Sequence, residues 1–193
     1  LISGKPGILV FHLGTEKQQL DLVFQVLEDT EIPIKHFRPT HVGKVLGQAA
    51  EFAKRGGYID FTASNGGGTA KILTGALSEG VDPGLVTLST DSNGSLPRWN
   101  ERHEMIGLQA AVMTSMHDTV KSLILEQGME IATALSFVTR NVARALEIDA
   151  RKGSIRSGSD ADILLLDEAL TVKTVLAKGR VMMQDGEILV KGT

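Results

Sequence analysis

A fourfold alternation of short apolar runs with amphipathic stretches, between residues 7 and 92, is the feature that most constrains the fold. The apolar runs have the length and composition of buried strands, and the stretches between them repeat apolar residues at the three-to-four spacing of a helix. The predicted strands cover residues 7–13, 37–42, 58–64 and 86–91, and the predicted helices cover 16–28, 45–54 and 69–78. This order predicts a parallel sheet covered by helices.

Two α/β architectures fit this alternation, an open doubly wound sheet and a closed (β/α)8 barrel. No Gly-x-Gly-x-x-Gly motif follows the first strand, so dinucleotide binding has no support. Gly66-Gly67-Gly68 follows the third strand without a Lys-Ser or Lys-Thr pair behind it, which favours an active-site loop over a phosphate-binding loop.

The remainder of the chain divides near residue 150. Before that point the pattern predicts a polar loop over residues 92–98 and helices over 104–127 and 129–146. After it, a connection rich in Lys, Arg, Gly and Ser leads into short strands, and Asp185-Gly186 has the composition of a hairpin turn. We therefore expect residues 1–150 to form one α/β unit and residues 151–193 to contribute to a small β domain.

Composition excludes several classes of function. Aromatic residues make up 4% of the 193 residues and the formal net charge is -3, which argues against a stacking or phosphate-binding surface for nucleic acid. The chain has no cysteine, so disulfides and thiolate metal ligands are absent, which fits a cytoplasmic protein. No apolar run approaches the ~18–20 residues that span a bilayer, so we expect no membrane partner.

Three residues that could do chemistry end three of the predicted strands. His12 ends the first strand, His41 the second and Asp91 the fourth. In a β/α barrel the carboxyl ends of the strands surround one mouth, so these side chains could converge there. Imidazole and carboxylate together suit zinc or a similar divalent ion. Each residue alone also fits an ordinary role, as a hydrogen-bonded rim histidine or a capping aspartate.

Several segments resemble isoaspartyl (beta-aspartyl) dipeptidases of the amidohydrolase superfamily. The strand segments are GKPGILVFHLG, RPTHV and VTLSTDSNGSLP, at residues 4–14, 38–42 and 86–97. The tail, with residues 139–143, 152–155 and 158–163, is similar to the C-terminal signature of the superfamily. The resemblance covers almost the whole chain. It implies the C-terminal half of a metal-dependent (β/α)8 TIM barrel, strands five to eight, followed by strands of a small composite β-sandwich.

The resemblance also implies roles for individual residues. His12 and His41 match histidines that ligate one of two zinc ions, and Asp91 matches an aspartate that ligates the other ion and moves the proton. Ser95 matches a serine that binds the substrate's free carboxylate. The implied function is zinc-dependent hydrolysis of the amide bond of isoaspartyl dipeptides by a cytoplasmic homo-oligomer.

The sequence departs from the family pattern at two points. It contains no His-x-His, and its first strand already matches the fifth, so we expect the remaining metal ligands upstream of Leu1 and little activity from residues 1–193 alone. The arginine that follows the sixth-strand histidine in the family has no counterpart, and only Lys44 could supply a positive charge there. Two alternatives therefore stay open: another amidohydrolase, such as a dihydroorotase, hydantoinase or N-acyl amino acid deacylase, and a non-catalytic binding protein.

Overall fold

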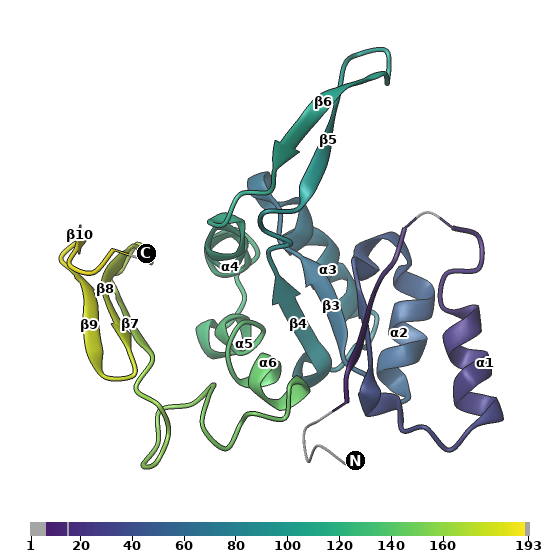
Figure 1. Cartoon of the computed structure of the whole chain (residues 1–193), viewed down its shortest axis with the longest axis horizontal. Helices are drawn as coiled ribbons and strands as arrows, with labels where there is room; N and C mark the ends of the chain where they lie inside the picture. Colours follow the sequence, from purple (N-terminus) through teal and green to yellow (C-terminus); the bar gives the residue numbers. More distant parts are fainter. Residues whose placement is uncertain (1–6, 15, 192–193) are drawn as a thin grey trace.

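The computed structural model describes residues 7–14 and 16–191 of the chain. A four-stranded parallel sheet in the order β1-β2-β3-β4 forms its centre (Figure 1). The parallel pairing and the sequential order confirm the predicted run of β/α units. The strands are β1 (Leu9–His12), β2 (Phe37–Thr40), β3 (Ile59–Thr62) and β4 (Val86–Ser89).

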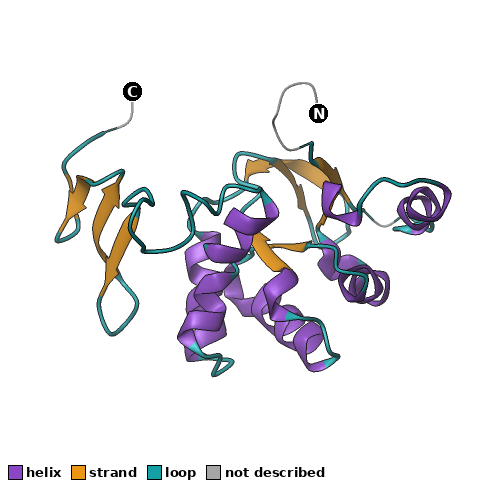
Figure 2. Ribbon diagram, turned by 90° about the horizontal axis from the view of Figure 1, so that it is seen from below, coloured by secondary structure: helices purple, strands orange, loops and turns teal. Residues whose placement is uncertain are grey.

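Helices connect consecutive strands and lie on one side of the sheet (Figure 2). Gly56 ends the helix between β2 and β3 with a φ of 90°, a conformation that favours glycine. The connecting helices are α1 (Asp21–Asp29), α2 (Leu46–Lys54) and α3 (Gly68–Ser78). Short 3₁₀ turns lie beside them: η1 (Ile34–His36), η2 (Val42–Lys44), η3 (Asn65–Gly67) and η4 (Pro83–Leu85).

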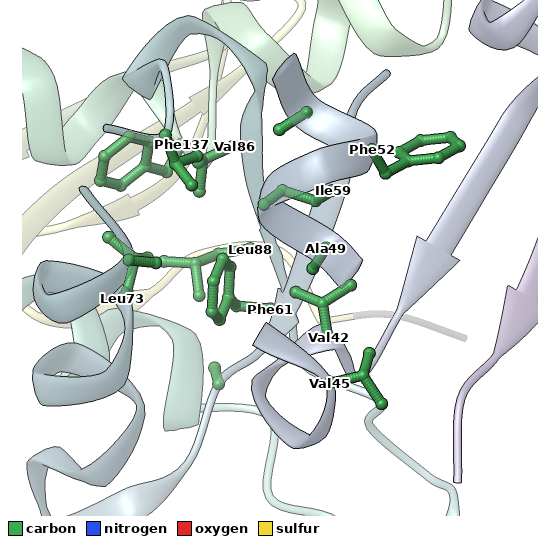
Figure 3. Close-up of a cluster of buried hydrophobic side chains, with 14 of the residues drawn as sticks. Val42, Val45, Ala49, Phe52, Ile59, Phe61, Leu73, Val86, Leu88 and Phe137 are labelled. Atoms are coloured by element: carbon green, nitrogen blue, oxygen red, sulfur yellow. The ribbon is translucent and has the colours of Figure 1, made fainter. Parts of the chain in front are cut away.

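The sheet has one apolar and one polar face, because side chains alternate along each strand. The register sets Asp60 beside Thr87 and Phe61 beside Leu88, so polar residues share one face and apolar residues the other. The apolar face packs beneath the helices into the main hydrophobic core, part of which Figure 3 shows. Its central residues are at most 3% exposed: Ile59, Phe61, Val86 and Leu88 from the strands and Leu73 from α3.

The region after β4 differs from the prediction of a loop followed by one long helix. Residues 95–110 form an antiparallel hairpin, β5 (Ser95–Trp99) and β6 (Met105–Ala110), which projects from the body of the molecule (Figure 1). The helix α4 begins only at Ser115 and ends at Leu125. Over a short window, the apolar residues of β6 have a spacing that also fits a helix. Pro97 of β5 has no amide hydrogen, so it disfavours a helix but is tolerated in this exposed strand.

The predicted helix over residues 129–146 is divided into α5 (Ile131–Ser136) and α6 (Arg140–Ala145). The division has a clear cause at Phe137. Its carbonyl oxygen accepts a hydrogen bond from the backbone N–H of Leu88 in β4, 3.0 Å away, instead of continuing the helix. The Phe137 side chain is fully buried, so this residue fixes the helical layer to the sheet through both backbone and side chain.

The tail forms a second four-stranded sheet, antiparallel and in the order β10-β9-β8-β7, which lies to one side of the parallel sheet (Figures 1 and 2). Asp185 and Gly186 both have positive φ and join β9 to β10, as the sequence predicts for a tight hairpin. The strands are β7 (Ile163–Leu166), β8 (Val172–Ala177), β9 (Arg180–Gln184) and β10 (Glu187–Ile188). Within the described residues, every helix is too short or too polar to cross a lipid bilayer.

The core predicts a large difference between two chemically identical substitutions. Leu73→Ala removes a side chain that is fully buried in the core and should lower the free energy of unfolding by ~2–5 kcal/mol. Leu22→Ala changes a side chain of α1 that is 61% exposed, and should change that free energy by about 0.5 kcal/mol or less. Urea unfolding of the two variants measures both values, and equal losses would contradict this assignment of the core.

Candidate metal centre

Three strand ends bring His12, His41 and Asp91 together. His12 is the last residue of β1, His41 directly follows β2, and Asp91 lies two residues beyond β4. One potential ligand atom from each lies within 4.8 Å of the others. Nδ1 of His12 is 2.8 Å from Nε2 of His41, which in turn is 3.8 Å from Oδ2 of Asp91. The sequence predicted that these three side chains would meet at the carboxyl ends of the strands. Their role as metal ligands stays a prediction.

The backbone at His41 and Asp91 is strained. Both residues adopt positive φ, 63° and 49°, in the left-handed region that non-glycine residues seldom occupy. Such conformations cost of order 1–3 kcal/mol each and persist only where the surroundings enforce them. The turn after Asp91 is also tight, because a Cβ atom on Gly94 would lie 2.9 Å from the carbonyl oxygen of Asp91. These turns direct both side chains toward the same point.

The surroundings of His41 favour a neutral, oriented imidazole. Its Nδ1 is 2.5 Å from the hydroxyl oxygen of Thr62 in β3. Burial lowers the pKa of His41 below its ordinary value, although Asp91 opposes this effect by stabilising the charged ring. When Nδ1–H donates to Thr62, the lone pair of Nε2 faces His12 and Asp91, which is the form of histidine that binds a metal.

Asp60, a carboxylate on the polar face of β3, was not predicted from the sequence as a functional residue. Its two oxygens accept hydrogen bonds from Thr40, Thr87 and Ser89 at 2.6, 2.7 and 2.6 Å. Burial raises the pKa of Asp60, and the three hydroxyl groups act in the opposite direction. The available signal was the alternation in Ile59-Asp60-Phe61-Thr62, which puts Asp60 and Thr62 on the face opposite the core.

Two cavities meet at Asp91. One, of about 320 Å³, is lined by Asp91, Thr62 and Ser64 and by Leu96 and Gln109 from the base of the hairpin. The other, of about 340 Å³, covers the polar face of the sheet and includes both His12 and Asp60. Volumes near 300 Å³ lie at the small end of the range for ligand pockets in proteins. Asp91 therefore borders both of these spaces, and His12 borders one of them.

Ser95 and Lys44 each follow a candidate ligand closely in sequence, Ser95 after Asp91 and Lys44 after His41. Ser95 is the first residue of β5 and is exposed at the base of the hairpin. Lys44 ends η2, three residues after His41, and its charge helps to lower the pKa of His41. His103 lies between β5 and β6, at the exposed tip of the hairpin.

The donor set fits a divalent ion. Catalytic zinc sites use three nitrogen or oxygen ligands and leave a fourth position for water or substrate. Two imidazoles and one carboxylate, one imidazole being held by a hydroxyl group, satisfy that chemistry. The cluster could therefore hold a metal ion at the junction of the two cavities.

Comparison with known proteins decides the family. The profile of the amidohydrolase family matches residues 34–182, well over half of the chain. The chain belongs to the amidohydrolase family. Two solved structures of beta-aspartyl dipeptidase from Fervidobacterium islandicum AW-1, one in complex with the beta-Asp-Leu dipeptide, match 99% of this amidohydrolase chain. Their sequence identities are 37% and 34%, and their TM-scores are 0.88 and 0.84.

The chain spans only part of the length of the proteins that it matches. The chain spans 52% of the length of the dipeptidase in the dipeptide complex. It also matches an adenine deaminase from Roseobacter denitrificans, at 31% identity over 121 residues, which make up 62% of this chain and 18% of the deaminase. The chain therefore belongs to the amidohydrolase family and has the fold of part of its barrel, as the sequence predicted.

The environment of His41 predicts a pH-dependent stability of the metal-free chain. The pKa of His41 in the folded chain lies below the ordinary 6.5. At pH values between these two pKa values, the unfolded chain therefore binds more protons than the folded chain. Stability should therefore be highest above pH 6.5 and fall as the pH drops through the lowered pKa. Urea midpoints between pH 7.5 and 5.5, measured with a chelator, should fall less steeply for His41→Gln than for the wild type; equal slopes would contradict the assignment.

Proposed function

We propose that this protein hydrolyses the amide bond of isoaspartyl dipeptides with the help of bound zinc. The single observation that carries the proposal is the likeness to the beta-aspartyl dipeptidase in complex with beta-Asp-Leu, 37% identical over 99% of this chain. The geometry agrees with it, because two imidazoles and a carboxylate meet beside a cavity of about 320 Å³.

His12, His41 and Asp91 would hold the metal in this proposal. His12 and His41 would ligate one ion and Asp91 the second, with two zinc ions in a complete site. Zinc bound there would supply an activated water and polarise the scissile carbonyl. Thr62 keeps the His41 ring oriented through its 2.5 Å contact with Nδ1.

Asp91 would move the proton during the reaction. It lines both cavities, so its carboxylate can reach a water between the ligands and the substrate. It accepts the proton of the attacking water and then donates that proton to the leaving amine, which completes the cleavage of the amide bond. The tight turn at Gly94 holds its backbone during both steps.

The substrate would be anchored by groups at the rim. Ser95 would donate a hydrogen bond to a free carboxylate of the dipeptide, and Lys44 would supply a positive charge beside it. Lysine acts as a point charge and lacks the two-pronged geometry of arginine, so carboxylate recognition should be less directional than with an arginine. A dipeptide also matches the size of the cavity beside Asp91.

The larger organisation follows the same proposal. Residues 1–150 would contribute to the catalytic barrel, and residues 151–193 would supply strands of a small β-sandwich domain. We propose a cytoplasmic homo-oligomer whose partners are small dipeptides rather than nucleic acid or membranes.

Adenine deamination is the second candidate, because an adenine deaminase is 31% identical over 121 residues. That match covers 62% of the chain, against 99% for the dipeptidase, and so gives less support. The two reactions differ in their products. A dipeptidase releases two amino acids from beta-Asp-Leu, whereas a deaminase releases ammonia from adenine.

We expect the complete gene product that contains residues 1–193, loaded with zinc, to hydrolyse beta-Asp-Leu and to release no ammonia from adenine. Asp91→Asn should lower kcat by at least ~10²-fold, because the proton acceptor is lost. Asp29→Asn, an exposed aspartate at the end of α1, is the matched control and should keep wild-type kcat. Amino acid release, followed by chromatography, measures both variants.

Two results would contradict the proposal. Ammonia release from adenine without cleavage of beta-Asp-Leu would favour the deaminase instead. Absence of zinc from the purified protein, together with no hydrolysis of either substrate, would favour a non-catalytic relative.

A further inference from the structure

The strand β3 carries no candidate metal ligand, yet it lies between the strands that carry His41 and Asp91. The sheet order is β2-β3-β4, so the separation of these two residues depends on how β3 joins its neighbours. β3 pairs with β4 along four residue pairs, but with β2 only at Thr40 and Asp60. Backbone pairing therefore fixes one side of β3 much more firmly than the other.

The side chain of Asp60 supplies a cross-strand connection at this level. Oδ2 accepts hydrogen bonds from Thr40 of β2 and from Ser89 of β4, both at 2.6 Å. Oδ1 accepts a further bond from Thr87 of β4 at 2.7 Å. An ionised carboxylate only accepts, so it sets the orientation of all three hydroxyl groups. One oxygen atom thus joins the two strands that flank β3.

The bonded hydroxyl groups lie next to the candidate ligands in sequence. Thr40 immediately precedes His41, and Ser89 comes two residues before Asp91. Both ligands have the strained, left-handed backbone that requires enforcement by the surroundings. Hydrogen bonds at Thr40 and Ser89 fix the chain just before each of these turns. Thr62, two residues after Asp60 on the same face, then orients the His41 ring.

We infer that Asp60 is a positioning residue, which joins the ends of β2 and β4 through Thr40 and Ser89 so that His41 and Asp91 face the same metal centre. The inference rests on the proposed function, because it assigns the carboxylate to the geometry of that metal site. Burying a carboxylate costs free energy unless the carboxylate accepts hydrogen bonds. Asp60 accepts three, and all three donors are hydroxyl groups and not charged side chains.

The first test measures the zinc affinity of the complete gene product that contains residues 1–193, by competition with a chromogenic chelator. Asp60→Asn removes the charge and one acceptor with little change in volume, and should weaken zinc binding by ~10–100-fold, as for other groups that support metal ligands. Asn141→Ala is the control. Asn141 is fully buried and donates to the carbonyl oxygens of Pro83 and Val86 at the opposite end of β4. The Asn141→Ala substitution should lower the Tm of the protein without changing its zinc affinity.

The second test needs no metal. Side-chain ¹⁵N NMR of the metal-free gene product reports the environment of the His41 ring, with its signals assigned from their loss in His41→Gln. Asp60→Asn should shift the His41 ring nitrogens, whereas Asn141→Ala should leave them in place. If Asp60→Asn does not fold, Thr40→Val and Thr87→Val replace it, since each removes one buried hydroxyl group bonded to Asp60. Thr40→Val should shift the His41 signals, and Thr87→Val should shift them less.

The outcomes separate the two proposals. A wild-type gene product that binds no zinc would overturn the metal site of the proposed function, and the His41 signals alone would then decide the role of Asp60. Unchanged zinc affinity and unchanged His41 signals in Asp60→Asn would overturn the inference, while zinc binding by the wild type would leave the proposed function standing. A similar loss of zinc affinity in Asn141→Ala would also overturn it, because general destabilisation would then explain the effect.

Discussion

Burial of one face of the parallel sheet is the interaction on which the other features depend. Apolar residues at alternate positions of β3 and β4 pack against α3 and Phe137, and this sets which way every strand faces. The intervening positions must then point to the opposite face, where Asp60, Thr62, Thr87 and Ser89 lie. Because the strands are parallel, their carboxyl ends share one edge, and His12, His41 and Asp91 meet there. The site is thus a consequence of how the core is packed.

Much of this arrangement could be predicted from the sequence, since hydrophobic periodicity is a local signal. The four strands, the helices between them and the Asp185-Gly186 turn were recognisable in this way. Three strand-ending residues could be expected at one edge because parallel strands require it. The hairpin over residues 95–110 was missed because its short apolar spacing also fits a helix, and only pairing between β5 and β6 resolves the ambiguity.

Other features depend on contacts between residues far apart in the chain. The break at Phe137 follows from a hydrogen bond to Leu88, 49 residues earlier, and no local pattern announces it. Asp60 reads as an ordinary polar position in a strand until Thr40 and Ser89 are placed beside it. The division of the chain near residue 150 and the roles of Ser95 and the candidate ligands stay predictions, since geometry alone does not assign them.

The left-handed backbone at His41 and Asp91 lowers the stability of the fold at the residues that carry the candidate metal ligands. Glycine adopts the same conformation without the steric cost, so a chain released from any need for a cation would become more stable with glycine at both positions. Keeping these two side chains therefore lowers the free energy of unfolding. Loops of this kind resist improvement by stability engineering, because the most favourable replacements would delete the functional groups themselves.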